Sequence, residues 1–201
     1  MQTNEEAYVD FLETKYRPGR DFYLTHFIYP RCAAEFSPGL IYDIGCGLGA
    51  FLEYCKRRNL PAKGFDSNPQ LVERCLKKGL AVTLEDIVRP KADYPPAPNL
   101  ICDNVLEHLT SDEIDAFFSN VKRYWAPGGA LLVIVPNRKG YESDPTHKTF
   151  VDKRIISQMA LKHQLTLVRQ YRHPISWRIP GDYYIFNMTV FKLENRPGGY
   201  E

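Results

Sequence analysis

The chain has 201 residues, of which 44% are hydrophobic and 25% charged, and this length and composition are typical of one globular domain with a core. Its 26 lysines and arginines nearly balance its 24 aspartates and glutamates, which argues against a nucleic-acid partner held mainly through phosphates. No run approaches the roughly 20 apolar residues needed to span a bilayer, and the first residues, MQTNEEAYVD, are unlike a signal peptide, so we expect no membrane insertion.

Helical and strand patterns begin near the N-terminus. Residues 1–38 are rich in tyrosine and phenylalanine and are predicted to fold as helices that cap the functional site. The continuous apolar run at 40–44, LIYDI, predicts a buried strand. A helix is predicted to follow, because apolar side chains recur at the i, i+3, i+4, i+7 spacing at Leu48, Phe51, Leu52 and Cys55.

The next segment repeats the alternation of strand and helix. Residues 62–65 and 81–84 predict two short strands. Between them, Asn68 is a typical N-cap, Pro69 takes the first helical position, and Gly79 is suited to end the helix.

A fourth strand is predicted at 100–104, LICDN, after a proline-rich loop. Thr110 and Glu113 have the spacing of a capping box, which predicts a helix that runs to about Trp125. The inner face of this helix is expected to hold Ile114, Phe117, Phe118 and Val121.

The last third of the chain contains three further strand patterns. Residues 127–129, Pro-Gly-Gly, predict a turn into the strand 130–135. A helix is predicted near 151–163, and two consecutive strands at 165–171 and 184–193 predict an antiparallel hairpin at one edge of the sheet.

This order of elements predicts an α/β fold in which a doubly wound, mostly parallel sheet is covered by helices on both faces. We expect a single domain, with residues 1–38 as a cap, 39–193 as the α/β core and 194–201 as a tail.

A glycine-rich loop, DIGCGLGA at 43–50, joins the first strand to the first helix of the core. Glycines let the backbone turn tightly and let a ligand approach the main chain. Asp66 ends the second strand about 20 residues further on, where a carboxylate can hold both hydroxyls of a ribose. Gly45, Gly47 and Ala50 also fit the dinucleotide pattern G-x-G-x-x-[GA], so the loop alone leaves the ligand open.

Asp43 favours S-adenosylmethionine over a dinucleotide. It lies two residues before the first glycine, at the end of the strand where the ligand passes. A pyrophosphate at this position would meet a like charge, whereas S-adenosylmethionine carries an ammonium and a sulfonium and has no phosphate. The alternative is that Asp43 only caps the loop by accepting a hydrogen bond from a backbone N–H.

Five segments follow one another between about residues 38 and 137: DIGCGLGAF, GFDSN, LEDI, DNVLEHL and WAPGGALLVIVPN. In this order they resemble motif I, the acidic loop, the adenine-binding segment, the segment after strand four and the lead into strand five of the class I S-adenosylmethionine-dependent methyltransferases. The resemblance implies S-adenosylmethionine as cofactor and a Rossmann-like sheet of seven strands in the order 3-2-1-4-5-7-6.

The resemblance also implies roles for residues of the first two motifs. Asp43 would bind the amino acid moiety of the cofactor, and the backbone of Gly45, Cys46 and Gly47 would pass close to it. Asp66 would hold the ribose.

The later motifs would surround the adenine and the sulfonium. Ser67 would flank the adenine edge, Asp86 would accept a hydrogen bond from the exocyclic amine, and Ile87 would pack on the ring. Asn104 would line the pocket beside the sulfonium. For Asp86 the alternative is a solvated acid in a loop.

Transfer of a methyl group from a sulfonium is a displacement with a good leaving group, so positioning supplies much of the catalysis, but an alcohol acceptor needs a base. His108 and His147 follow strands four and five, at the edge where this architecture binds ligands. His147 lies in YESDPTHKTF, which resembles the D-x-x-H segment of small-molecule methyltransferases, and with Asp144 nearby it is the first candidate base. The alternatives are that His108 only orients its loop and that His147 is an exposed loop residue.

A partial metal-ligand pattern lies at the same edge. Asn104-x-x-Glu107-His108, with His147 downstream, partly resembles the E-x-x-E-H metal ligands of quinone-precursor O-methyltransferases and small-RNA 2′-O-methyltransferases. Because asparagine replaces the first acid, a charge that Mg²⁺ prefers is missing, and we expect no metal.

These features together predict an O-methyltransferase that acts on a small molecule or glycan in a polysaccharide or natural-product pathway. Tyrosines of the N-terminal cap would line the acceptor pocket, and the opposite wall would come from His173, Trp177, Arg178, Tyr183 and Tyr184. The alternatives are an RNA 2′-O-methyltransferase, a dinucleotide-dependent oxidoreductase and a non-catalytic nucleotide-binding module. Five cysteines without a C-x-x-C pair indicate reduced thiols and a cytoplasmic location, and the oligomeric state stays open.

Overall fold

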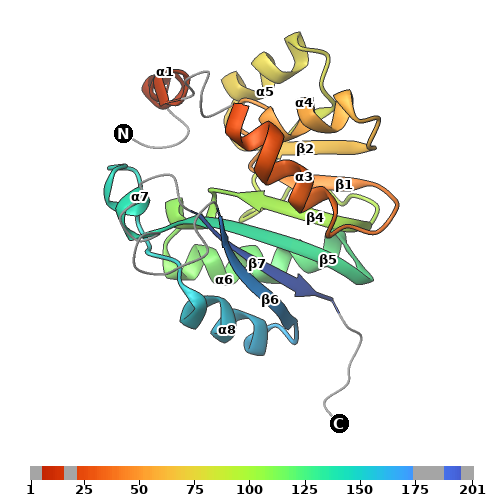
Figure 1. Cartoon of the computed structure of the whole chain (residues 1–201), viewed down its shortest axis with the longest axis vertical. Coiled ribbons are helices and arrows are strands. Elements are labelled where there is room, and N and C mark those ends of the chain that lie inside the picture. The colour runs from red at the N-terminus through yellow and green to blue at the C-terminus, as the bar shows by residue number, and fades with distance from the viewer. Residues whose placement is uncertain (1–5, 16–21, 174–187, 196–201) are drawn as a thin grey trace.

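The computed structural model describes residues 6–15, 22–173 and 188–195. Its sheet has seven strands in the order β3-β2-β1-β4-β5-β7-β6 (Figure 1). The strands are β1 (Ile41–Ile44), β2 (Ala62–Asp66), β3 (Val82–Leu84), β4 (Ala97–Asp103), β5 (Trp125–Pro136), β6 (Thr166–His173) and β7 (Met188–Glu194). All neighbours are parallel except β7, which is antiparallel to both β5 and β6. The predicted fold class, strand order and terminal hairpin are confirmed.

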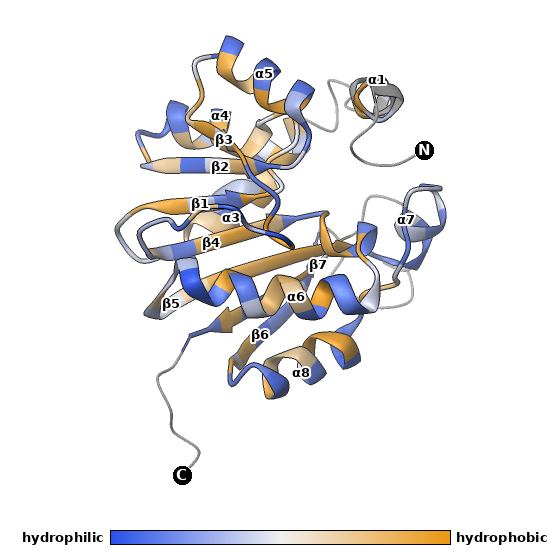
Figure 2. Cartoon of the chain, turned by 180° about the vertical axis from the view of Figure 1, so that it is seen from behind, coloured by the Kyte–Doolittle hydropathy of each residue, from blue (hydrophilic) through white to orange (hydrophobic). Residues whose placement is uncertain are grey.

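Helices cover both faces of the sheet. The helices that come before the first strand are α1 (Glu6–Lys15), η1 (Leu24–Ile28) and α3 (Tyr29–Ala33). The helices that connect later strands are α4 (Ala50–Arg57), α5 (Pro69–Lys77), η2 (Leu106–His108), α6 (Ser111–Val121), η3 (Lys122–Tyr124), α7 (Arg138–Glu142) and α8 (Lys153–Lys162). Figure 1 and the reverse view in Figure 2 place α3 and α4 on one side of the sheet and α6 and α8 on the other. None of the described helices is long and apolar enough to cross a membrane.

The strand β5 shows why a continuous apolar run is needed in the centre of this sheet. Its side chains alternate between two cores, as the pleat of a strand requires. Leu131, Val133 and Val135 pack in the cluster that includes α6 and α8, and Leu132 and Ile134 pack in the cluster that includes η1, α3 and α4. Both faces of β5 are therefore buried.

The helix starts follow the sequence signals. Asn68 is the N-cap of α5, and its Oδ1 accepts hydrogen bonds from the backbone N–H groups of Gln70 (2.9 Å) and Leu71 (3.3 Å). The capping box of α6 is formed as predicted: Thr110 Oγ1 accepts from Glu113 N, and Glu113 Oε2 accepts from Thr110 N.

Two helix boundaries differ from the prediction. The helix α4 begins at Ala50, after Leu48, because Gly49 at its N-cap has a left-handed φ of 80°. The helix α6 ends at Val121 rather than near Trp125, since the next three residues form the 3-10 turn η3 and Trp125 already belongs to β5.

The Pro-Gly-Gly segment also differs from the prediction. It lies inside β5 and does not precede it, because the pairing of β4 with β5 begins at Ala97 with Trp125 and resumes at Asn99 with Ala130. This irregularity in register accommodates the extra residues 127–129 as a bulge.

Further differences concern the ends of β4 and β5. Asn104, predicted as the end of a strand, lies beyond β4 with a left-handed φ of 55°. The short helix α7 was not predicted. Residues 174–187, which include Trp177, Arg178, Tyr183 and Tyr184, lie outside the described residues, as do residues 1–5, 16–21 and the tail from 196.

Candidate active site

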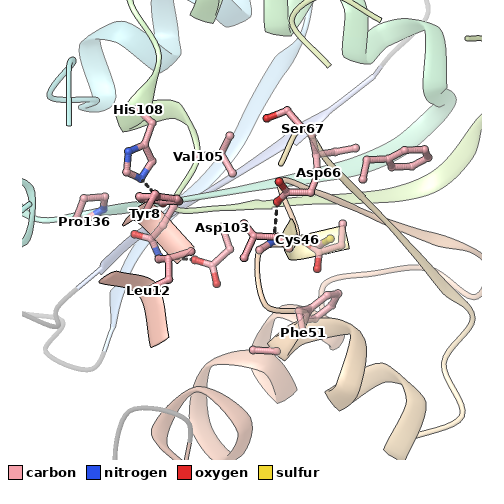
Figure 3. Close-up of a pocket in the computed structure, with 18 of the residues that line it drawn as sticks. Tyr8, Leu12, Cys46, Phe51, Asp66, Ser67, Asp103, Val105, His108 and Pro136 are labelled. Carbon is pink, nitrogen blue, oxygen red and sulfur yellow. Dashed lines mark hydrogen bonds between the residues drawn. The ribbon is translucent and has the colours of Figure 1, made fainter. Parts of the chain in front are cut away.

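A cavity of about 800 Å³ lies at the edge of the sheet where β1, β2, β4 and β5 end. Parallel strands bring the residues that follow them to one edge, which is where ligands bind in open α/β sheets. All eleven predicted site residues line this cavity: Asp43, Gly45, Cys46, Gly47, Asp66, Ser67, Asp86, Ile87, Asn104, His108 and His147. Figure 3 shows Asp66, Ser67 and Cys46 on one side of the cavity and His108 on the other, with Asp103 between them.

Asp43 is a buried acid at the end of β1, with 2% of its surface exposed. Burial raises its pKa well above the usual range, and the nearby carboxyl groups of Asp103 and Asp66 raise it further. A cation that entered the cavity would stabilise the ionised form of this group.

Asp66 links the glycine loop to β2. Its Oδ2 accepts a hydrogen bond from the backbone N–H of Gly47 (2.8 Å), and its Oδ1 accepts one from the backbone N–H of Asn68 (2.9 Å). Burial raises its pKa, and these backbone donors partly offset the effect. The backbone of Ser67 also donates to this carboxylate, and an ionised carboxylate has about four acceptor sites, so some acceptor capacity remains for a ribose hydroxyl.

Two consecutive acidic residues follow β3, and they differ in burial and in hydrogen-bond partners. Glu85 is buried, and its two oxygens accept hydrogen bonds from Lys91 N (3.0 Å) and the Tyr94 hydroxyl (3.0 Å). Asp86 is half-buried and accepts from Val88 N (2.9 Å), with Arg89 3.9 Å from its other oxygen. Glu85 therefore holds the turn together, whereas Asp86 retains acceptor sites at the cavity.

The turn after β4 places an amide beside an acid. The Asn104 backbone N–H donates to the carbonyl of Ile134 (2.9 Å), which fixes the turn to β5. The Asn104 side chain donates to Asp103 Oδ1 (2.7 Å). Asp103 lines the cavity together with the predicted residues.

His108 lies at the end of η2 and is 9% exposed. On one side, its Nδ1 is 3.0 Å from Thr146 Oγ1 and 3.4 Å from the Thr146 carbonyl oxygen. On the other side, its Nε2 is 3.5 Å from the hydroxyl of Tyr8, which belongs to α1 and also lines the cavity (Figure 3).

His147 packs against His108 with ring centroids 4.8 Å apart. Its Nδ1 donates to the carbonyl of Tyr141 (2.7 Å), because a carbonyl oxygen can only accept. Its Nε2 lies 3.7 Å from Asp144 Oδ2 and 4.0 Å from Glu107 Oε1, and its side chain is 4% exposed. The loop histidine is thus buried between carboxylates.

Glu107, His108 and His147 are the described residues that come nearest to a metal-ligand set, with donor atoms within 4.8 Å of one another. One zinc ion would hold neighbouring donors about 3.3 Å apart, given metal–ligand distances of about 2.0 Å. The 4.0 Å between Glu107 Oε1 and His147 Nε2 is wider than this.

The elements before the sheet close the cavity on one side. Its lining includes Tyr8 and Leu12 of α1, Tyr23 and Leu24 at η1, and Tyr29 of α3. The Tyr23 hydroxyl hydrogen-bonds to Nδ1 of His173, at the end of β6. The predicted aromatic cap is therefore represented in the lining by three tyrosines.

A family model described as a methyltransferase domain matches residues 15–178 of the chain. The chain belongs to the class I S-adenosylmethionine-dependent methyltransferases. This methyltransferase therefore uses S-adenosylmethionine as its cofactor. The alternatives of a dinucleotide-dependent oxidoreductase and a non-catalytic nucleotide-binding module are set aside.

Solved structures share the fold at low sequence identity. A methyltransferase from Archaeoglobus fulgidus is 16% identical, with a TM-score of 0.64 over 89% of this chain and 100% of that one. One from Clostridium acetobutylicum is 12% identical, with a TM-score of 0.69 over 96% and 100%. The N-methyltransferase NodS from Bradyrhizobium japonicum is 16% identical, with a TM-score of 0.68 over 90% and 99%. No curated protein matches this chain by sequence.

Two residues of the site, Asp103 and Thr146, were missed by sequence reasoning. Asp103 ends β4 as Asp66 ends β2, and this shared position was a usable signal. Thr146 lies two residues after Asp144, a spacing typical of a side-chain turn. Tyr8 belongs to the predicted aromatic cap, but its position 3.5 Å from His108 was not predicted, since only the packing of α1 brings the two together.

Proposed function

We propose that this methyltransferase methylates a hydroxyl oxygen of a small molecule or glycan. S-adenosylmethionine supplies the methyl group, attached to a sulfonium sulfur that leaves easily. A bond forms between the acceptor oxygen and the methyl carbon, the carbon–sulfur bond breaks, and the hydroxyl proton passes to a base. The observation that carries the proposal is His108, whose Nε2 faces the cavity beside the hydroxyl of Tyr8.

The cofactor is proposed to bind along the glycine loop with its charge matched by acids. Asp43 would pair with the ammonium group and Asp66 would accept from the ribose hydroxyls through its remaining lone pairs. Asp86 and Ile87, with Ser67 at the rim, would contact the adenine. Asn104 and the backbone of residues 45–47 would lie along the methionine part.

The charge of the lining favours an acceptor without phosphates. Among the described residues, the cavity is lined by six acids and by no lysine or arginine: Asp43, Asp66, Glu85, Asp86, Asp103 and Asp144. Recognition of a nucleic acid or a phosphorylated sugar depends on cationic side chains. Tyrosines suit a neutral sugar or phenol, because each offers a flat apolar face and a hydroxyl.

We further propose that the reaction needs no metal. The 4.0 Å separation of Glu107 Oε1 from His147 Nε2 supports this. The neutral imidazole of His108 would instead accept the proton of the hydroxyl group as a general base.

The acceptor class is tested by incubating the purified protein with S-adenosylmethionine and panels of neutral sugars, phenols, primary amines and short RNAs, and identifying products by mass spectrometry. We expect methyl ethers from sugars or phenols and S-adenosylhomocysteine in equal amount. Products methylated only on nitrogen would contradict the oxygen acceptor. Methylation confined to RNA would contradict the small-molecule class.

A further inference from the structure

We propose that Thr146 is a positioning residue that fixes the tautomer of His108, with the proton on Nδ1 and the lone pair of Nε2 directed at the acceptor site. The role given to His108 in proton transfer rests on the function proposed above. The tautomer itself follows from the hydrogen bonds of three buried residues: Asp144, Thr146 and His108.

The first step concerns the single proton of the Thr146 hydroxyl. Thr146 Oγ1 lies 2.6 Å from Asp144 Oδ1, and the same oxygen accepts the backbone N–H of Thr146 at 2.9 Å. An ionised carboxylate only accepts hydrogen bonds, so the hydroxyl donates its proton to Asp144. No proton is then left on Thr146 Oγ1 to give to another partner.

The second step concerns Nδ1 of His108. It faces Thr146 Oγ1 at 3.0 Å and the Thr146 carbonyl at 3.4 Å. Because the hydroxyl has donated its proton elsewhere and a carbonyl has none, both oxygens can only accept. Nδ1 must therefore carry a hydrogen, since a lone pair there would face two further lone pairs.

The third step follows from the chemistry of neutral imidazole, in which one ring nitrogen donates and the other accepts. With its proton on Nδ1, His108 presents an acceptor at Nε2, 3.5 Å from the hydroxyl of Tyr8 in the cavity. A hydroxyl group of the methyl acceptor that replaced the Tyr8 hydroxyl, or bound beside it, would contact the Nε2 lone pair that a general base needs.

His147 is held differently and is assigned a supporting role. Its Nδ1 donates to the Tyr141 carbonyl, and its Nε2 faces Asp144 and Glu107. His147 thus lies beside the Asp144 carboxylate, which takes the proton of Thr146. Four titratable groups surround His108: Tyr8 from α1, Glu107 from η2, and Asp144 and His147 from the loop after α7.

The tautomer is measured directly by nitrogen NMR of the five histidines in ¹⁵N-labelled full-length protein saturated with S-adenosylhomocysteine. The His108 signals are assigned from their loss in His108→Gln, and spectra at several pH values identify the neutral ring. We expect the Nδ1–H tautomer in the wild-type protein. An Nε2–H tautomer would overturn the proposal.

Variants of Thr146 separate positioning from packing. Thr146→Val keeps the shape but removes the nearer of the two acceptor oxygens and leaves the backbone carbonyl, so we expect it to weaken the preference for Nδ1–H. Thr146→Ser keeps the hydroxyl and should restore it. An unchanged tautomer in Thr146→Val would contradict the role of Thr146.

If Thr146→Val does not fold, as judged by its thermal transition, Asp144→Ala provides the second measurement. This variant frees the Thr146 hydroxyl to donate to Nδ1, so the Nε2–H tautomer should appear. Retention of Nδ1–H would overturn the proposal. These readouts need no methyl acceptor, so they are independent of the screen that tests the proposed function.

Discussion

At the scale of single residues, the buried carboxyl group of Asp43 makes the stability of the fold depend on pH. The folded chain retains the proton of Asp43 at pH values where the unfolded chain has released it, because burial raises the pKa of this group in the folded state. The folded state then binds more protons, so the free energy of unfolding contributed by Asp43 falls as the pH rises through this window.

For this reason Asp43→Asn is expected to stabilise the cofactor-free chain at neutral pH. The same substitution should lower the affinity for S-adenosylhomocysteine about 10- to 100-fold, because a charged hydrogen bond is lost. Denaturant melts and calorimetric titration measure the two effects. The wild-type affinity should fall as the pH is lowered through the raised pKa of Asp43, and Asp43→Asn should show a flatter profile. Asp112→Asn, at an exposed acid of α6, is the control. Equal affinities in Asp43→Asn and wild type would remove Asp43 from the binding site.

His108 is expected to act on turnover and not on cofactor affinity. With an oxygen acceptor identified by the product screen, His108→Gln should lower kcat by about 10²- to 10⁴-fold, the contribution of a general base. The dissociation constant of S-adenosylhomocysteine should stay within about twofold, since the cofactor is proposed to bind along the glycine loop. His26→Gln, at an exposed position hydrogen-bonded only to the Phe22 carbonyl, serves as the matched control. An unaltered kcat in His108→Gln would exclude it as the base.

At the scale of elements, the start of α5 beside the cavity is held by a side-chain cap. Asn68→Ala removes the acceptor for two N–H groups of α5, and should lower the free energy of unfolding by about 1 kcal/mol. Asn68→Asp keeps an acceptor and should recover most of this loss. Urea denaturation compares the three proteins. If Asn68→Asp lowered the free energy of unfolding as much as Asn68→Ala, packing of the side chain and not capping would be the cause of the loss.

At the scale of the whole molecule, the cofactor is expected to stabilise the fold without help from a metal. S-adenosylhomocysteine at about 100 times its dissociation constant should add roughly 2.7 kcal/mol to the free energy of unfolding. The same stabilisation, and the same turnover with an oxygen acceptor, should persist after dialysis against EDTA. Loss of turnover that Mg²⁺ or Zn²⁺ restores would show that Glu107, His108 and His147 do bind an ion.

Local signals in the sequence predicted the strands and the helix starts, and the family resemblance supplied the strand order and the expected roles of the cofactor-binding residues. The apolar runs of β1 and β5 exclude a surface position, and the caps at Asn68 and Thr110 begin helices through hydrogen bonds that span only three residues. The glycine loop and Asp66 are brought together by adjacent parallel strands. The boundary errors at Leu48 and at residues 127–129 arose where a positive φ or a bulge interrupts a regular pattern.

The acceptor end depended on the tertiary structure. Tyr8, His108 and Thr146 are separated by 100 and 38 residues along the chain, and nothing in the local sequence of one predicts contact with the others. Sequence reasoning placed His147 first as the base because of its Asp-x-x-His spacing, whereas packing turned its Nε2 toward two carboxylates. By itself, the sequence determined the fold and the cofactor, since both rest on short-range patterns. Only the tertiary structure decided which imidazole nitrogen faces the cavity, because its hydrogen-bond partners come from distant segments.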